Sequence, residues 1–305
     1  SRLGGDEFTV LLTNLRDAQD AAIVARRILD ELAKPFQLDG REVFITASIG
    51  IGVFPSDGTA IDILLKNADL AMYHAKEQGR NNFQFYSSTM NATAAERLTL
   101  ENDLWKGLER RELMVYYQPQ VNLRANGIVG AEALVRWRHP QRGIMLPAAF
   151  LPMAIDTGLV RYLDEAVLLM ACRQNKAWQD AGYAPIRMSV NISNSFFHGG
   201  HVTKAVAKGL QETRLNPRFL KLELTESIAM RDVEASIAML QDLRDLGVQL
   251  AIDDFGTGYF SLNYLQRLPL NLLKIDQSFV QDMTRSVASA SIMRAIVALA
   301  HNLNL

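Results

Sequence analysis

The chain of 305 residues has little of several features that would place it in a special class of protein. Its single cysteine, Cys172, excludes an internal disulfide framework and suits a reducing compartment. No apolar run approaches the roughly 18 residues of a membrane span, and no signal peptide is recognised at its start. These absences predict a soluble cytoplasmic protein, or the cytoplasmic part of a membrane-anchored sensor, with no membrane contact in this segment.

An excess of charge of either sign is also missing. The 32 Lys and Arg residues nearly balance the 33 Asp and Glu residues, which leaves a formal net charge of −1. So even a balance gives no electrostatic reason to expect a nucleic acid polymer or an anionic membrane as partner. What the chain does have is 49% hydrophobic residues, which suffices for a sizeable core and predicts two domains.

Residues 1–86 are predicted to form the first domain. Period-two apolar patterns indicate strands at 8–12, 42–54 and 83–86, and helical spacing of apolar residues indicates helices at 17–32 and 60–79. Residues 87–111 follow with the pattern of a helix that links the first domain to the second. Residues 112–305 are expected to form that second domain.

The second domain shows a regular alternation of short apolar runs and helical stretches. The expected strands are 114–117, 130–137, 187–192, 220–224, 249–252 and 272–275, and the expected helices are 148–154, 163–181, 201–213, 233–246, 261–265 and 287–303. Repeated βα units indicate either an open doubly wound sheet or a (β/α) barrel. The lack of a Gly-x-Gly-x-x-Gly turn disfavours a dinucleotide-binding fold. A closed barrel has eight strands and six are predicted, so we expect the intact protein to continue beyond Leu305.

Two adjacent carboxylates, Asp253 and Asp254, end the apolar run 248–252 and lead into the glycine-containing segment 255–258. A buried parallel strand would deliver them to the open rim of an α/β fold, where such folds carry their chemistry. Neighbouring side chains on a strand point to opposite faces, so a buried structural pair explains them poorly. A solvated turn, with Asp and Gly as turn formers, is the alternative.

Acidic, amide and basic side chains recur where other predicted strands end: Glu132 with Arg136, Asn191, Glu223 with Glu226, and Lys274 with Asp276. Oxygen ligands without His or Cys suit Mg²⁺ or Mn²⁺ better than Zn²⁺. Two adjacent carboxylates can bridge a pair of ions about 3.5–4 Å apart, which activates a water for attack on a phosphodiester. Lys274 could then neutralise developing charge and Arg136 could clamp a phosphate. Taken singly, Glu223 and Glu226 could equally be helix caps, and Lys274 a surface residue.

Several motifs in the second domain together resemble a known family. They are Glu132-Ala133-Leu134 with Val135-Arg136-Trp137, Val190-Asn191-Ile192-Ser193, Glu223-Leu224-Thr225-Glu226-Ser227, Asp253-Asp254-Phe255-Gly256-Thr257-Gly258 and Leu273-Lys274-Ile275-Asp276. Their order and spacing, from about Arg97 onward, resemble the motif series of EAL-domain cyclic di-GMP phosphodiesterases. The resemblance implies an α/β fold with an EAL-type (β/α)8 TIM-like barrel, incomplete in this chain, that hydrolyses cyclic di-GMP to pGpG with metal-activated water.

The resemblance also implies roles for particular residues. Metal binding, to Mg²⁺ or Mn²⁺ with two ions per site, would fall to Glu132, Asn191, Glu223, Asp253 and Asp254, of which Asp254 would serve the second ion. The catalytic residues would be Lys274, Glu132, Asp253 and Asp254, with Lys274 assisting the water. Gln118 and Arg136 would contact the dinucleotide, and Glu226 would hold the loop from Asp254 to Tyr264. Members of this family are also expected to form homodimers through the EAL domain.

The first domain resembles the GGDEF diguanylate cyclases through Gly4-Gly5-Asp6-Glu7-Phe8 and through the helix that contains Asn67-Ala68-Asp69, Ala71-Met72-Tyr73 and residues 75–81. The resemblance implies the C-terminal portion of an α/β GGDEF domain. Asp6 and Glu7 would serve metal binding and catalysis, Gly4 and Gly5 would let the backbone approach GTP, and Lys76 and Arg80 would meet its phosphates. Composition alone would make Gly4-Gly5-Asp6 a type I′ turn.

Two other functions remain open at this point. The chain could be a non-catalytic receptor for cyclic di-GMP, although such relatives usually lose ligands of the Glu132 or Asp253 type. Alternatively, it belongs to a bifunctional protein whose complete GGDEF domain makes cyclic di-GMP. The segment alone is not expected to do so, because the family's N-terminal half precedes Ser1.

Overall fold

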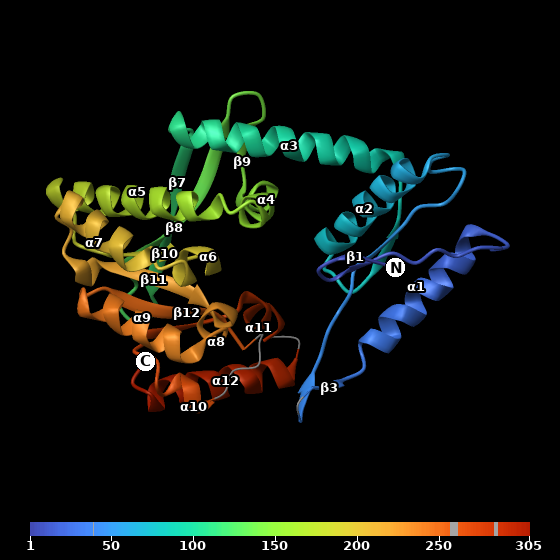
Figure 1. The fold of residues 1–305 in the computed structure, drawn as a ribbon. Helices are drawn as coiled ribbons and strands as arrows, with labels where there is room; N and C mark the ends of the chain where they lie inside the picture. The colour runs from blue at the N-terminus through green and yellow to red at the C-terminus, as the bar shows by residue number, and fades with distance from the viewer. Residues whose placement is uncertain (39, 257–261, 284–285) are drawn as a thin grey trace. The chain divides into compact units, whose positions relative to one another are not determined.

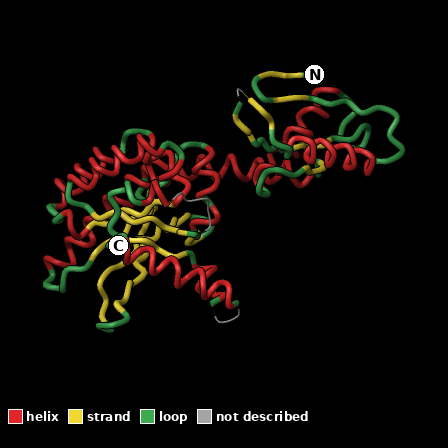
Figure 2. Tube along the Cα trace, turned by 90° about the horizontal axis from the view of Figure 1, so that it is seen from below, coloured by secondary structure: helices red, strands yellow, loops and turns green. Residues whose placement is uncertain are grey.

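The computed structural model of the chain describes residues 1–38, 40–256, 262–283 and 286–305. Contacts divide it into two compact units, Ser1–Leu100 and Glu101–Leu305. Within the described ranges, every helix is too short or too polar to cross a membrane. Most elements of both units are labelled in Figure 1, and all described elements are coloured by type in Figure 2.

The first unit combines short strands with two helices. Its elements are β1 (Arg2–Gly4), β2 (Glu7–Phe8), α1 (Ala18–Leu32), β3 (Phe36–Leu38), β4 (Arg41–Val43), β5 (Ile49–Ile51), α2 (Ile61–Glu77), β6 (Phe83–Phe85) and the start of α3 (Ser88–Glu109). Strand β5 pairs in parallel with β6, and α2 packs closely on β5. A Cβ atom at Gly50 would lie 1.9 Å from the carbonyl oxygen of Ala68, so only glycine allows this approach.

Two expected strands of this unit differ from prediction. The strand expected at 8–12 ends at Phe8, since its pairing with β1 ends there and the apolar residues that follow are exposed. The strand expected at 42–54 is divided into β4 and β5, which pair with different partners. Both helices were predicted correctly, and the Asp17 side chain caps α1 by accepting hydrogen bonds from the backbone N–H groups of Gln19 and Asp20.

The second unit is built around one sheet of seven strands. Its strands are β7 (Leu113–Asn122), β8 (Gly127–His139), β9 (Gly143–Met145), β10 (Arg187–Asn191), β11 (Leu220–Thr225), β12 (Gln249–Phe255) and β13 (Leu272–Ile275). The order across the sheet is β13-β12-β11-β10-β8-β7, and β9 pairs with the C-terminal end of β8, residues 137–139. Strands β8 and β10 to β13 run parallel, which confirms the predicted βα repeats of a TIM-like barrel.

Strand β7 departs from the repeat because it pairs antiparallel with β8. Only residues 123–126 join the two strands, and so short a connection can form a hairpin but not a crossover. The hairpin turn includes Asn126 with a φ of 49°. The first strand of the sheet therefore runs against the parallel strands β8 and β10 to β13, as does the short strand β9.

Helices surround the sheet, as Figure 2 shows, and follow the parallel strands in turn. They are η1 (Pro147–Ala149), α4 (Leu151–Asp156), α5 (Val160–Asp180), α6 (Asn194–His198), α7 (Val202–Thr213), η2 (Pro217–Phe219), α8 (Glu226–Met230), α9 (Val233–Asp245), α10 (Leu262–Leu265), α11 (Gln277–Asp282) and α12 (Val287–Asn302). Fully buried Asn175 ties α5 to the sheet, since its Nδ2 donates to the carbonyl oxygens of Ile186 and Phe219, both at 3.1 Å.

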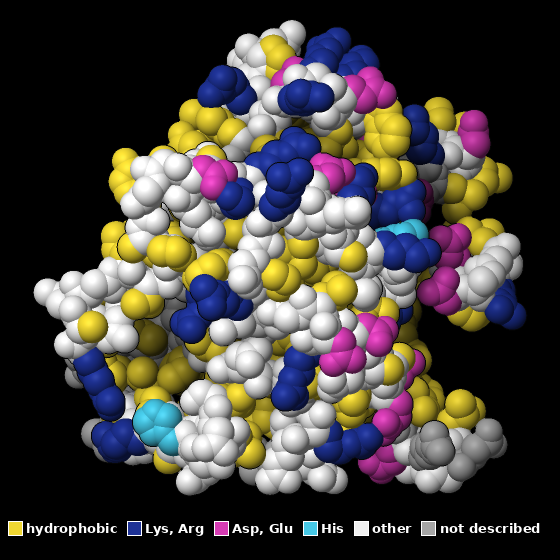
Figure 3. Space-filling view, turned by 90° about the vertical axis from the view of Figure 1, so that its left-hand side faces the viewer, with side chains coloured by type: hydrophobic (Ala, Val, Ile, Leu, Met, Phe, Trp, Pro, Cys, Tyr) yellow, Lys and Arg dark blue, Asp and Glu magenta, His cyan; other side chains and the backbone are white. Residues whose placement is uncertain are grey.

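The surface agrees with the even charge balance of the sequence. On the face shown in Figure 3, Lys and Arg side chains are interspersed with Asp and Glu among apolar and neutral residues. Such a mixed surface carries no strong field of one sign.

Candidate metal and phosphodiester site

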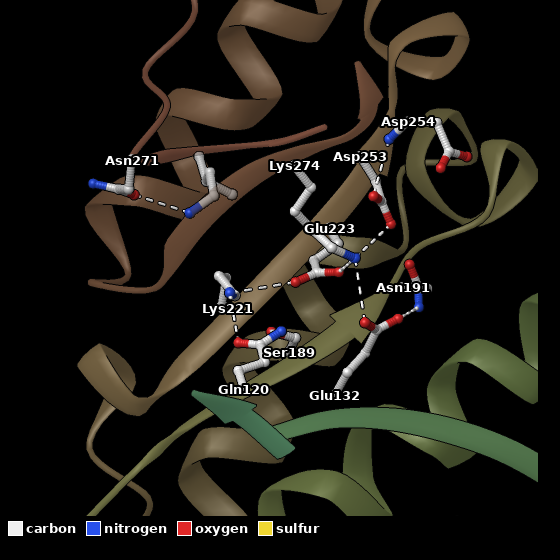
Figure 4. Close-up of polar contacts among 11 residues, drawn as sticks. Gln120, Glu132, Ser189, Asn191, Lys221, Glu223, Asp253, Asp254, Asn271 and Lys274 are labelled. Carbon is white, nitrogen blue, oxygen red and sulfur yellow. Dashed lines mark hydrogen bonds and ion pairs between the residues drawn. The ribbon is translucent and has the colours of Figure 1, made fainter. Parts of the chain in front are cut away.

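Three carboxylates from three strands meet at the centre of the second unit. Carboxylate oxygens of Glu132 (β8), Glu223 (β11) and Asp253 (β12) lie within 4.8 Å of one another. Lys274 of β13 places its Nζ among them, at 3.3 Å from Glu132 Oε2 and 2.7 Å from Asp253 Oδ2, and it also bonds Glu223 Oε2 (Figure 4). Asn191 of β10 completes the group, because its Nδ2 donates to Glu132 Oε1 at 2.8 Å.

The strand register explains this convergence. Asn191 lies opposite Glu223 in the β10–β11 pair, and Asp253 lies opposite Thr225 in the β11–β12 pair. Alternate residues of a strand point to the same face, so Glu223 and Thr225 share one face of β11 and their partners in register lie beside them. Parallel strands in register thus bring residues far apart in sequence to one place.

Burial makes the charges of this cluster strongly dependent on one another. The Glu223 side chain is fully buried, and those of Lys274, Glu132 and Asp253 are about a fifth exposed. Burial by itself would lower the pKa of Lys274, but its hydrogen bonds to Asp253 and Glu223 outweigh that effect and raise the pKa above its ordinary value. Lys274 therefore remains an ammonium and serves as internal counter-ion to the acids.

The donor set fits a hard divalent cation. All candidate ligand atoms are carboxylate or amide oxygens, the ligands that Mg²⁺ and Mn²⁺ prefer. The Lys274 ammonium shows that a positive charge is accommodated among the three acids. With Glu132, Glu223 and Asp253 ionised, the ammonium groups of Lys274 and of Lys221, which lies 3.4 Å from Glu223, leave one formal negative charge. The cluster can therefore accept further positive charge.

Asp254 is next to this cluster but separate from it. Its backbone has a φ of 54°, its side chain is exposed, and it is directed away from the Lys274 ammonium in Figure 4. Partial desolvation first, and then repulsion from Asp253 and Asp276, raise the pKa of Asp254. The role of Asp254 at a second ion thus stays a prediction.

The remaining predicted residues of the second unit lie on β7, β8 and α8. Gln118 is directly opposite Glu132 in the antiparallel β7–β8 register, which places both side chains on the same face. Arg136 lies four residues further along β8, with its guanidinium 5.3 Å from the ring centroid of Tyr116. Glu226 begins α8 as a buried residue, and neither of its carboxylate oxygens has a hydrogen-bond partner among the described residues. Residues 257–261 of the loop that Glu226 was predicted to hold lie outside the described ranges.

The residues predicted for a nucleotide site in the first unit occupy a hairpin and a helix end. Gly4 and Glu7 pair in the β1–β2 hairpin, and positive φ occurs at Gly5 (52°) but not at Asp6. This is the pattern of a type II′ turn, not of type I′. Lys76 lies exposed in the last turn of α2, and Arg80 follows it with a φ of 58°.

Sequence analysis missed a second buried lysine. Lys221 Nζ lies 3.4 Å from Glu223 Oε1 and 3.1 Å from Gln120 Oε1, and Gln120 Nε2 donates to Ser189 Oγ at 3.2 Å (Figure 4). One signal was available, because Lys221 stands two residues before Glu223 on a predicted strand and therefore shares its face.

A TIM-like α/β unit with three carboxylates and a lysine at its centre defines a candidate metal-dependent hydrolase. Comparison with known families agrees: a model described as EAL domain matches residues 101–305, and one described as diguanylate cyclase, GGDEF domain, matches residues 1–82. The chain belongs to the EAL domain family, and its residues 1–82 match the GGDEF domain family.

Named relatives share both parts of the chain. It is 48% identical to the bifunctional diguanylate cyclase/cyclic di-GMP phosphodiesterase MucR of Pseudomonas aeruginosa, over 100% of this chain and 44% of that protein. It is 39% identical to the cyclic di-GMP phosphodiesterase PdeR of Escherichia coli, over 100% of this chain and 46% of that protein. The chain thus spans less than half the length of these relatives. A solved structure, "PaMucR Phosphodiesterase, c-di-GMP complex", is 46% identical with a TM-score of 0.65, over 68% of this chain and 84% of that one.

Proposed function

We propose that the unit Glu101–Leu305 hydrolyses cyclic di-GMP to the linear dinucleotide pGpG. The observation that carries this proposal is the gathering of Glu132, Glu223 and Asp253 around the Lys274 ammonium. Acids that approach so closely inside a protein repel one another strongly unless cations are present. The names of MucR and PdeR, which share this unit, support cyclic di-GMP as the substrate.

The cofactor in this proposal is Mg²⁺ or Mn²⁺, with two ions per site. Glu132, Asn191, Glu223 and Asp253 would hold one ion, and Asp254 would serve the second. When bound, such ions neutralise phosphate charge and lower the pKa of a water so that it can attack phosphorus.

The side chains of the chain have distinct tasks in the reaction. Lys274 carries a positive charge at the acids, where it can stabilise the negative charge that develops on the phosphate oxygens. Gln118, on the face of Glu132, and Arg136 would orient the dinucleotide, and Arg136 can offer two parallel donors to a phosphate. Glu226 would hold the loop from Asp254 to Tyr264.

Further proposals concern the rest of the chain. We propose the domain division 1–86, 87–111 and 112–305, a homodimer through the EAL domain, and a cytoplasmic location. GTP would bind the GGDEF domain at Gly4, Gly5, Asp6, Glu7, Lys76 and Arg80. At Gly5 the positive φ would be unfavourable for a residue with a side chain. This supports a hairpin whose backbone can approach GTP closely.

Turnover of cyclic di-GMP by the chain, and by a version of intact length, tests the main proposal. Glu132→Ala should lower Mn²⁺-dependent pGpG release by at least about 100-fold. That is the upper end of the loss seen when a residue that supports a metal ligand is mutated, and Glu132→Ala removes a ligand itself. The matched control is Glu109→Ala, an exposed glutamate at the end of α3, which should leave release unchanged. Binding of cyclic di-GMP in Ca²⁺ is measured in parallel. Tight binding without pGpG release in Mg²⁺ or Mn²⁺ by the intact-length protein would assign a receptor instead.

A further inference from the structure

Glu223 is the most deeply buried acid of the site, and its two oxygens face different cations. The Oε2 atom bonds the Lys274 ammonium at the centre of the three acids. The Oε1 atom points the other way, has no hydrogen-bond partner among the described residues, and lies 3.4 Å from the ammonium of Lys221. Both side chains are almost completely buried, at 0% exposure for Glu223 and 5% for Lys221.

Lys221 is itself held in place from three neighbouring strands. Its Nζ donates to Gln120 Oε1 at 3.1 Å, and Gln120 Nε2 in turn donates to Ser189 Oγ at 3.2 Å. Gln120 can lie there because the facing residue is Gly130, where a Cβ atom would come within 2.8 Å of Gln120 Oε1. Strands β7, β8 and β10 thus combine to fix the ammonium beneath the β11 carboxylate (Figure 4).

A buried carboxylate oxygen without any partner is costly, and a buried ammonium is equally so. The two groups offset this cost for each other, and the result is a fixed orientation of the Glu223 carboxylate. One oxygen is engaged by Lys221, and the other bonds the Lys274 ammonium and faces Glu132 and Asp253. A cation among the three acids would therefore meet a single, preoriented oxygen of Glu223.

We propose that Lys221 is a positioning residue of the metal site, acting through Glu223 Oε1, with Gln120 and Ser189 as its support. This inference rests on the proposed function only in taking Glu223 as a ligand of a divalent cation. Lys221 would not touch the dinucleotide. Its removal should consequently change the affinity for metal and not the recognition of substrate.

A direct titration with Mn²⁺ in the absence of substrate tests the inference. The electron paramagnetic resonance signal of the free ion reports how much Mn²⁺ is bound. Lys221→Met keeps a side chain of similar length but leaves Glu223 Oε1 without a cation. We expect the dissociation constant for Mn²⁺ to rise by roughly tenfold or more, as for other residues that orient a metal ligand. In turnover assays, excess Mn²⁺ should restore much of the rate, with KM for cyclic di-GMP unchanged.

The matched control is Asn175→Leu, which disturbs a fully buried polar residue of the same unit away from the acids and should leave Mn²⁺ affinity unchanged in the folded protein. Circular dichroism verifies that each variant is folded. If Lys221→Met does not fold, Gln120→Leu frees the lysine without removing it. An increase of about tenfold in the dissociation constant, the lower end of the range for residues that support a metal ligand, is then expected.

Three results would overturn the inference. In the first, Lys221→Met, or Gln120→Leu in its place, binds Mn²⁺ with the same affinity as the wild type. In the second, that variant binds Mn²⁺ more tightly, which would mean that the ammonium only repels the ion. In the third, Asn175→Leu weakens Mn²⁺ binding to the same extent. These outcomes are distinct from a failure of the proposed function, in which the wild type binds Mn²⁺ and cyclic di-GMP but releases no pGpG.

Discussion

Asp164 of α5 offers a quantitative test of how burial acts in the second unit. Its carboxylate accepts a hydrogen bond from the backbone N–H of Ser193 at 3.1 Å, and Ser193 follows closely after the site residue Asn191. Burial, only partly offset by the bonds from Ser193, raises the pKa of Asp164 from 3.8 to about 7.

The sign of the effect on stability follows from linkage. Because the folded pKa lies above the unfolded one, the folded state holds the proton more tightly. The stabilisation of the folded state by its tighter binding of the Asp164 proton is complete below about pH 3.8 and is lost as the pH rises to about 7. A difference of about three units at 1.36 kcal/mol each makes the loss about 4 kcal/mol.

Asp164→Asn abolishes the titration and keeps an amide oxygen that can accept the bond from Ser193. We expect the variant to be more stable than the wild type, by an advantage that grows by roughly 2 to 3 kcal/mol between pH 5 and pH 8. Urea unfolding followed by tryptophan fluorescence measures this, because all three tryptophans, Trp105, Trp137 and Trp178, lie in the unit Glu101–Leu305.

Asp242→Asn, on the exposed face of α9, is the control for the loss of one negative charge and should show no comparable pH dependence. An Asp164→Asn advantage that is equal at pH 5 and pH 8 would refute the reasoning. So would a variant that is less stable than the wild type at pH 8.

Three further substitutions test other parts of the structure. Lys274→Met should lower pGpG release by about 10²–10³-fold, as is usual when one group that stabilises transition-state charge is removed. A smaller loss would contradict the proposed role of the Lys274 ammonium. Asn175→Leu removes the donor that serves two partly buried carbonyl groups and should lower the free energy of unfolding by about 2–5 kcal/mol in the fluorescence assay. A neutral effect would mean that the carbonyls find other donors. Gly50→Ala should destabilise the first unit by at least about 1–3 kcal/mol and speed limited proteolysis within residues 1–100, without altering the tryptophan transition of the second unit.

Much of the site was accessible from the sequence because its residues stand at recognisable positions within local patterns. Glu132, Asn191, Glu223, Asp253 and Lys274 each lie in or at the end of a predicted strand, and parallel strands end at one edge of a sheet. The motif order then led to the EAL family, which the comparison confirmed. The antiparallel direction of β7 was not predicted, because the expected strands 114–117 and 130–137 left residues 118–129 between them. In the structure both strands are longer and only residues 123–126 join them, which makes a hairpin.

What escaped prediction depends on contacts between distant segments. Lys221 reads as an ordinary strand residue, and nothing near it in the chain indicates Gln120, which lies 101 residues away. The division of 42–54 into β4 and β5 likewise depends on which strands pair, a choice that periodicity does not contain.

The sequence by itself therefore determined the repeating strands and helices, the family and the set of acids, since each follows from local periodicity or a short motif. Tertiary structure alone decided that Lys274 is shared by three acids, one of them 142 residues away, and that Lys221 engages the outer oxygen of Glu223. The physical reason is that strand register and burial set these distances. Inside the unit, a separation of a few ångströms between charges decides whether a carboxylate is a costly buried ion or an oriented ligand.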